Sequence, residues 1–416
     1  MAFTPTLRRT ILILVSLATA LTVTVAPAEA AIQRPIAAAP QPDAAAGVVG
    51  YGAKTAGGAG GRVIWVTNRN DSGAGSLRAA LMASGRRIVR FRIAGTIVLQ
   101  SRIKIRNPFI TVAGNMARGE GVQLRGHPII VVTHDVILRH LRIRLGDALL
   151  SSAEAKDADP LTLNGVEKNT YNIVLDHMSL LWGTDIGGLA ILGNVHDVTV
   201  QNSIIGEGLY LSRQPSSHDG DGNSMGMNVT PMVPGQTPPT RLTFYRNLFT
   251  TSDLRMPRLM GAVCADMVNN VIYNWGIHAA MGNPRSLNIV ANWFRRGPRM
   301  KTSDYWLPSA GSVAPSLFHT SVFTRSNRMD GFSGHRHANG VVYAASARCG
   351  GLSVHASPVP TVLNSVLTNV GAKLPVRDAI DRRVIFNVRN RVGRYFNGVG
   401  YAAPHPYWPT LSPFLP

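Results

Sequence analysis

The middle of the chain repeats one short pattern of apolar and polar positions. Each copy has alternating β-branched residues, a polar residue, and then a second short apolar run. Six copies read "DVILRHLRIRLGD", "NIVLDHMSLLWGTD", "DVTVQNSIIGEG", "RLTFYRNLFTTSD", "ADMVNNVIYNWG" and "LNIVANWFRRGP". A repeat of roughly 22 to 25 residues indicates a solenoid, and the alternation with β-branched residues indicates strands rather than helices.

One polar position of the repeat is occupied by side chains that can bond to one another. Aligned in this way, the position holds His140, His177, Asn202, Asn247, Asn270 and Asn292. We expect the amides to stack from coil to coil as a ladder that satisfies otherwise buried polar groups. The leucine spacing of a leucine-rich horseshoe is missing. The pattern therefore predicts an all-β fold, a single-stranded right-handed parallel β-helix.

The flanks of the repeat set the boundaries of this domain. Upstream, "RVIWVTNRNDSGAGSLRAAL" predicts a strand, a turn and a helix near Leu77–Met82, which we expect to cap the open end of the solenoid. We place the β-helix at residues 48–345 and a C-terminal segment, packed on its outside, at 346–416. Within that segment, "GAKLPVRDAIDRRVIFNVRNRVG" predicts a short helix.

The N-terminus has the features of an export signal. Two arginines precede an apolar run and a small-residue cleavage pattern, so residues 1–30 are predicted to be a signal peptide and 31–47 an Ala/Pro-rich linker. A membrane anchor is the alternative, but the apolar run is short for a span. We therefore expect a secreted, extracellular protein. Its two cysteines, Cys264 and Cys349, either pair or remain in the core.

The formal net charge of +20 favours a polyanionic partner, because such a field attracts polyanions. Nucleic acid is not expected, since the chain is exported and has no nucleic-acid-binding motif. An acidic polysaccharide suits the compartment better. A basic surface that only maintains solubility is the plainer interpretation.

Two groups of charged residues are candidates for chemistry. Asp157 and Asp159 are two residues apart, so an extended chain points both carboxylates to one face, and Asp185 follows about one coil later. Such oxygen ligands suit calcium, although aspartates that end strands are also common in turns.

Arg255 and Arg258 flank Pro257 directly after a strand-like run. The alternative is two surface arginines paired with nearby acids.

Several stretches resemble the bacterial pectate lyases, in one order over about residues 48 to 395. They include "VTNRNDSGAGSLRAAL", "ITVAGN", "LDHMSLLWGTD", "NLFTTSDLRMPRL" and "VNNVIYNWG". The resemblance implies calcium-dependent β-elimination of polygalacturonate outside the cell. It assigns calcium binding to Asp157, Asp159 and Asp185, and proton abstraction to Arg255. Arg258 would then bind a substrate carboxylate.

The chain departs from the family pattern in two places. Ile186 stands where a glutamate usually follows "WGxD", and a further family aspartate would fall on Leu189 or Ala190, so we expect a weakened calcium cage. The substrate lysine common one coil before the arginine motif is also missing. Arg213 and His218 are the substitutes that we predict to contact substrate. His335 and His337 have metal-like spacing but no further ligand cluster.

Three functions remain open at this point. The first is a secreted, monomeric pectate lyase that has no contact with the membrane after cleavage of its signal. The second is a non-catalytic β-helix that binds acidic polysaccharides. The third is a lyase of another polyuronate or of pectin.

Overall fold

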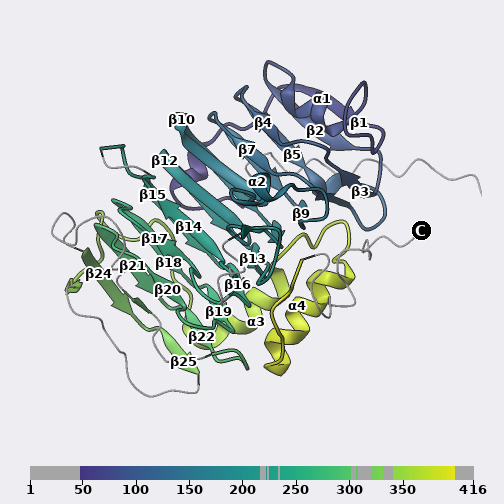
Figure 1. Cartoon of the computed structure of the whole chain (residues 1–416). Helices are drawn as coiled ribbons and strands as arrows, with labels where there is room; N and C mark the ends of the chain where they lie inside the picture. The colour runs from purple at the N-terminus through teal and green to yellow at the C-terminus, as the bar shows by residue number, and fades with distance from the viewer. Residues whose placement is uncertain are drawn as a thin grey trace, which may run out of the picture. The chain divides into compact units, whose positions relative to one another are not determined.

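The structure is a computed structural model that describes residues 47–215, 222, 224–232, 235–300, 306–307, 320–330 and 341–398. Its strands pair in parallel throughout two sheets, each strand lying beside its counterpart in the next coil (Figure 1). The expected parallel β-helix is therefore confirmed. His218, His335, His337 and the predicted signal and linker up to residue 46 lie outside the described residues.

One sheet forms a continuous wall of the solenoid. Among the described residues it has nine strands, stacked in chain order. They are β3 (Gly95–Val98), β6 (Val122–Arg125), β9 (Arg142–Arg144), β11 (Ser179–Leu181), β13 (Ile204–Gly206), β16 (Leu248–Thr250), β19 (Val271–Tyr273), β22 (Trp293–Arg295) and β25 (Arg328–Asp330).

The other sheet consists of two rows of strands. The first row comprises β4 (Ile103–Ile105), β7 (Ile129–Val131), the start of β10 (Leu161–Asp176), the start of β12 (Leu189–Gln201), β14 (Met227–Thr230), β17 (Arg258–Leu259), β20 (Ala280–Met281) and β23 (Trp306–Leu307). The second row comprises β1 (Arg62–Val66), β2 (Arg87–Phe91), β5 (Ile110–Ala113), β8 (Val136–Arg139), the ends of β10 and β12, β15 (Thr240–Tyr245), β18 (Ala265–Val268), β21 (Ser286–Val290), β24 (Thr320–Arg325) and β26 (Val341–Tyr343).

Strands β10 and β12 join the two rows because each is long enough to pass around a corner of the coil. The first residues of β10 pair with β7, whereas its last residues pair with β8. The register between β10 and β12 shifts between Gly165 and Thr170. Without these two strands the rows would be separate sheets.

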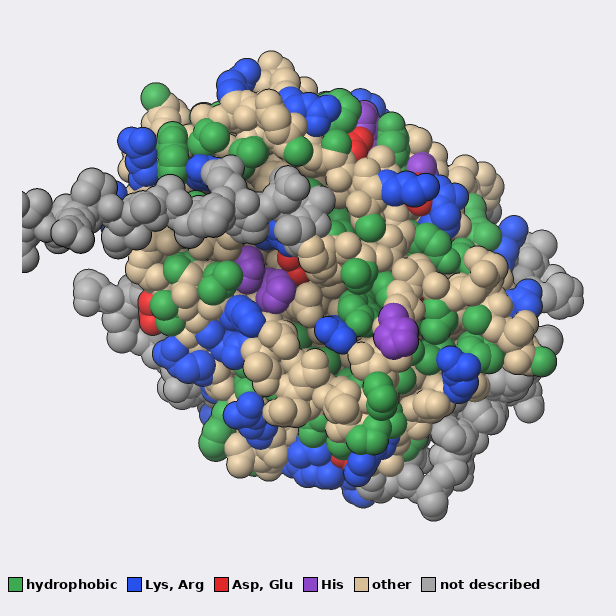
Figure 2. Space-filling view, turned by 180° about the vertical axis from the view of Figure 1, so that it is seen from behind, with side chains coloured by type: hydrophobic (Ala, Val, Ile, Leu, Met, Phe, Trp, Pro, Cys, Tyr) green, Lys and Arg blue, Asp and Glu red, His purple; other side chains and the backbone are tan. Residues whose placement is uncertain are grey.

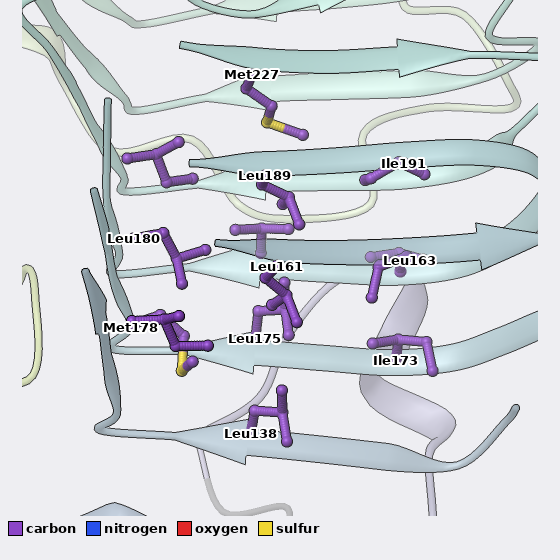
Figure 3. Packing of buried hydrophobic residues seen from close by; sticks show 14 of the residues in the cluster. Leu138, Leu161, Leu163, Ile173, Leu175, Met178, Leu180, Leu189, Ile191 and Met227 are labelled. Carbon is purple, nitrogen blue, oxygen red and sulfur yellow. The ribbon is translucent and has the colours of Figure 1, made fainter. Parts of the chain in front are cut away.

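The core is the interior of the coils, filled by one side of each strand. Leu161, Leu189 and Met227 lie at equivalent positions of successive coils and are fully buried. Figure 3 shows these side chains stacked above one another, with Leu163 and Ile191 in a parallel stack. The period of two in each strand points alternate side chains inward, so the apolar positions of the repeat became the core.

Helix α1 (Leu77–Met82) covers the N-terminal end of that core. Its N-cap Ser76 accepts a hydrogen bond from the Ala79 backbone, and Leu77, Ala80 and Leu81 are buried within the core cluster. The predicted capping helix is confirmed with the same bounds. Three other short segments are η1 (Tyr51–Lys54), η2 (Gly114–Met116) and α2 (Ser152–Ala155).

The side-chain ladder exists, but its register differs from the sequence alignment. Asn247 donates to Asn270, Asn270 to Asn292, and Asn292 to Asn327, at 3.0–3.1 Å. Asn202 pairs in register with Arg246, one residue before Asn247, because Gln201 lies opposite Tyr245. Ser203 takes the ladder position in that coil, where its backbone N–H donates to Asn247.

His140, His177 and Asn202 therefore occupy the turn position just before the ladder. All three have positive φ, between 49° and 55°. His140 and His177 stack on one another, with ring centroids 4.6 Å apart. Their alignment with the ladder asparagines was wrong by one residue, because Leu141 and Met178 stand at the ladder position of their coils.

Helices α3 (Val359–Asn369) and α4 (Ala379–Asn390) cover the outer face of the nine-stranded sheet (Figure 1). Only α4 was expected. Val366 and Val384 pack with sheet residues such as Ile204. Asp378, the N-cap of α4, and Asp381 form buried ion pairs with Arg144 of β9. The helices are thus fixed by an apolar layer and by charges.

Two further features bear on the sequence predictions. Cys264 and Cys349 form a disulfide, one of the two alternatives left open. Among the described residues, no helix combines the length and the apolar character needed to cross a bilayer.

Candidate active site

The candidate site lies on the outer side of the first row of strands. While Leu161, Leu189 and Met227 point into the core, their neighbours point the other way. The outward positions Thr162, Ala190, Asn228 and Arg258 pair consecutively from β10 to β17. This row and the turns that lead into it carry the predicted residues Asp157, Asp159, Asp185, Arg255 and Arg258.

Asp159 and Asp185 lie in the turns before β10 and β12. The Asp159 carboxylate is buried and accepts two hydrogen bonds, from the Ile186 backbone at 3.0 Å and from the Thr162 hydroxyl at 3.1 Å. Burial and the charge of Asp185 raise the pKa of Asp159 well above the ordinary value of an aspartate. This carboxylate is therefore held in place by the turn of the next coil.

Asp185 connects the acidic residues to the arginines. Burial raises its pKa to about 6, the positive charge of Arg255 opposes that shift, and the charge of Asp157 adds to it. Asp157 itself is exposed. Within the described residues, neither Asp157 nor Asp185 has a side-chain hydrogen bond, so their oxygens are available to a ligand.

Arg255 lies between β16 and β17, in a turn held by the coils on both sides. Its carbonyl accepts a hydrogen bond from Met227 N at 2.6 Å, and Met256 N donates to Ala279 O at 2.7 Å. Arg255 has a φ of 62°, an uncommon value for a side chain of this size. The backbone is therefore fixed where the guanidinium leaves it.

The guanidinium of Arg255 is easier to deprotonate than usual. Burial and the nearby charge of Arg258 lower its pKa to about 10, although Asp185 and Asp159 act in the opposite direction. Desolvation penalises the charged form, and a like charge adds to that penalty. Arg255 thus lies within electrostatic reach of both acids and of Arg258.

Arg258, in β17, has an incompletely satisfied guanidinium. Its Nε is buried without a hydrogen-bond partner, and burial lowers its pKa. Asn228, opposite in the register, likewise has a buried Oδ1 without a partner. Buried polar atoms without partners are uncommon in proteins, which marks this pair as a place where a polar ligand can bind.

Asn228 was missed by sequence reasoning. Its segment, "MNVT", has the strand alternation, and Arg258 lies 30 residues later (258 − 228 = 30). That interval exceeds the roughly 22 to 25 residues of the sequence repeat because a loop intervenes. Only the register of β14 with β17 places Asn228 beside Arg258.

Arg213 is not brought to this group. It is exposed, and its backbone N–H donates to Asp147 at 3.0 Å. Among the described residues, its charge is not one of those that act on the pKa of Asp185 or Arg255. Its predicted role as a substrate contact therefore has no support from the geometry.

The acidic residues suit a metal ion in kind more than in number. Carboxylate oxygens are the ligands that calcium prefers, and a cation would relieve the repulsion that raises the pKa of Asp159 and Asp185. Yet no three His, Cys, Asp or Glu side chains of the described chain are grouped closely enough to hold a metal. Ile186 is buried where the family pattern has an acid. Both carboxylate oxygens of Asp159 already accept hydrogen bonds from the protein.

No family model matches the chain, but individual relatives do. A probable pectate lyase C from Aspergillus fumigatus is 29% identical over 363 residues, which cover 83% of this chain and 76% of the relative. A probable pectate lyase C from Aspergillus flavus is 33% identical over 258 residues, which cover 61% of this chain and 54% of the relative.

Solved structures share the fold. A pectate lyase from Acidovorax avenae subsp. citrulli matches with a TM-score of 0.58 and 12% identity, covering 80% of this chain and 96% of that one. The cedar pollen allergen Jun a 1 matches with a TM-score of 0.54 and 19% identity, covering 78% and 92%. A pectate lyase from Bacillus sp. N165, solved with trigalacturonate, matches with a TM-score of 0.53 and 14% identity. The match covers 78% of this chain and 98% of that one.

The architecture thus defines the class, a parallel β-helix shared with solved pectate lyases. The sequence relatives are named as probable pectate lyases, and the chain is similar to them over most of its length. The restriction to bacterial members is not supported, because these relatives in sequence are fungal.

Proposed function

We propose that the protein is a secreted pectate lyase that cleaves polygalacturonate by β-elimination. The observation that supports the proposal is Arg255, which has a lowered pKa, a backbone held by the neighbouring coils, and electrostatic interactions with Asp159 and Asp185. The similarity to probable pectate lyases supports the same reaction. Residues 1–30 are the proposed export signal, and the disulfide between Cys264 and Cys349 suits an oxidising compartment.

The proposed reaction is a β-elimination that begins with the removal of a proton. A base removes the proton from C5 of a galacturonate, the C4–O bond breaks, and the C4=C5 double bond forms. The bonding pair leaves with the oxygen, which takes up a proton from water. We assign the base to Arg255 in its neutral form. Arg258 binds a substrate carboxylate through its guanidinium, and Asn228 offers its amide to the same sugar.

Calcium fits this site as a weakly held ion. Asp157, Asp159 and Asp185 would hold it, and it would neutralise the substrate carboxylate next to C5 and so acidify the C5 proton. Because the protein provides few free oxygens, the carboxylates of the substrate would complete the ligand set. We therefore expect calcium to bind measurably only when oligogalacturonate is present.

The first prediction tests the enzyme directly. Wild type should release 4,5-unsaturated products from polygalacturonate, detected by their ultraviolet absorbance, and a chelator should lower the rate. Arg255→Ala removes the base and should lower kcat by a factor of at least 100, with a small effect on KM.

A control variant separates the base from the general positive charge. Arg213→Ala removes an exposed arginine outside the group and should leave kcat within a factor of two. If wild type forms no unsaturated product from polygalacturonate, low-ester pectin or another polyuronate, the lyase proposal is wrong.

A second candidate function is favoured by the missing ligand cluster. A β-helix with Ile186 in place of an acid and without three grouped metal ligands among the described residues could retain polyuronate binding without turnover. A pull-down with polygalacturonate that succeeds while the absorbance assay stays silent would favour this function. A lyase of another polyuronate or of pectin would instead give product from that polymer alone.

A further inference from the structure

A second basic surface lies far along the chain from the candidate active site, on the C-terminal helices. A hollow of about 380 Å³ is formed between α3 and α4. Its floor includes Leu367 and Ile385, and its walls include Arg377, Arg382, Phe386 and Arg389. This volume is within the range that small-molecule sites occupy.

Three of these residues lie on one exposed face of α4. Arg382, Phe386 and Arg389 are separated by four and three residues, which places them one above another on a helix. Phe386 is 59% exposed, although it is a large aromatic residue. The opposite face of α4, with Val384 and Val388, is buried against the sheet. The helix therefore packs well without the Arg–Phe–Arg face.

The arginines of the hollow are not engaged in ion pairs within the described part of the chain. Among the described residues, none of Arg377, Arg382 and Arg389 forms a salt bridge. Arg377 donates only to the backbone carbonyls of Thr368 and Val370, at 3.0 and 2.8 Å, and its Nε is buried without a partner. Asp378 and Asp381, the nearest acids, are already engaged by Arg144. The positive charge of the hollow is thus available to an anion.

The chemistry of the lining selects one class of anion. Guanidinium groups bind carboxylates with two parallel hydrogen bonds, and an exposed aromatic ring offers a flat apolar surface. A uronate presents both complements, a carboxylate and the apolar face of a pyranose ring. A single inorganic anion would leave Phe386 without a partner.

We propose that the hollow between α3 and α4 is an accessory binding site for uronate residues of an acidic polysaccharide. This inference rests on the proposed function, since the ligand is the polymer that the active site would cleave. The helices pack on the nine-stranded sheet, whereas Asp185 and Arg255 precede strands of the other sheet (Figure 1). One molecule could thus hold a polymer at two places, which raises the local substrate concentration.

The test uses the full-length protein carrying Arg255→Ala, in chelator, so that the polymer is not degraded. Arg382→Ala/Arg389→Ala and, separately, Phe386→Ala should each weaken retention by polygalacturonate in affinity electrophoresis by a factor of five or more. Phe386→Trp should retain binding because it keeps an aromatic face. The matched control Arg69→Ala/Arg102→Ala removes two exposed arginines near the N-terminal cap, and it should change retention by less than a factor of two.

The outcomes separate this inference from the proposed function. If otherwise wild-type enzyme forms unsaturated product and binds polymer, but the α4 variants bind as tightly as their parent, the accessory site is wrong and the lyase stands. Equal losses in the α4 and control pairs would also overturn it, because they indicate general charge attraction. In the active background, the α4 variants should raise KM on polymer and leave trigalacturonate kinetics unchanged. Thermal melts check that each variant folds.

Discussion

At the scale of single residues, the candidate active site depends on how burial changes ordinary side chains. Arg255 is a plausible base only because desolvation and Arg258 lower its pKa to about 10. Asp185 is shifted in the other direction, to about 6, mainly by burial. Neither shift follows from residue type, because each depends on which groups the coils bring together.

The pH dependence of the rate follows from this assignment. The neutral form of Arg255 is the active one, and its fraction rises tenfold per pH unit below the pKa. We therefore expect log kcat/KM on trigalacturonate to rise with pH at a slope near one and to level off near pH 10. Arg258→Ala removes the like charge and should move the plateau to higher pH.

Initial rates between pH 7 and 10.5, with the enzyme assayed briefly at each pH, measure this profile. A rate that levels off near pH 7 would mean that another group accepts the proton.

At the scale of elements, the C-terminal helices are attached by charges that water does not reach. The side chains of Arg144, Asp378 and Asp381 are fully buried, Arg144 donates to both acids, and Arg142 also pairs with Asp378. The pKa of Asp378 is lowered to about 2: burial opposes ionisation, but the charge of Arg144 and the hydrogen bond from it prevail. The folded state therefore depends on complete pairing.

Removing Arg144 should break these ion pairs and destabilise the folded protein. Arg144→Ala leaves two buried carboxylates with less compensation, so we expect a loss of about 3–5 kcal/mol in the free energy of unfolding. Arg328→Ala is the matched control. It breaks a partly exposed ion pair with Asp330 and should cost less than about 1 kcal/mol. Urea unfolding followed by circular dichroism measures both, and equal losses would contradict the proposed role of Arg144.

At the scale of the whole molecule, the net charge of +20 should act on the encounter with substrate. Figure 2 shows basic side chains spread over the face that it presents, whereas acidic side chains there are few and isolated. A field of this kind attracts a polyanion over distances comparable with the Debye length, which shortens as salt is added.

The dependence on salt should therefore scale with the charge of the substrate. Raising NaCl from 25 to 300 mM should lower kcat/KM on polygalacturonate at least tenfold and on trigalacturonate much less, while kcat changes little. Steady-state kinetics on both substrates measures this. A similar loss on the two would indicate that salt acts within the active site rather than on the encounter.

The sequence alone determined the architecture and the chemistry to look for. The repeat of alternating apolar residues predicted the stacked coils, because side chains in a strand alternate between core and exterior. The stretch "RVIWVTNRNDSGAGSLRAAL" predicted the capping helix near Leu77–Met82. The spacing of Asp157 and Asp159 and the pair around Pro257 marked the charged candidates. These features are local, so they can be read along the chain.

The tertiary structure alone decided how the coils align with one another. Loops of different length separate the coils, so register is not visible in the sequence. That is why the alignment placed Asn202 one residue away from its position and why sequence reasoning missed Asn228. The pKa values of Asp185 and Arg255 also arise between coils, because electrostatic shifts depend on distance in space and on burial rather than on distance along the chain.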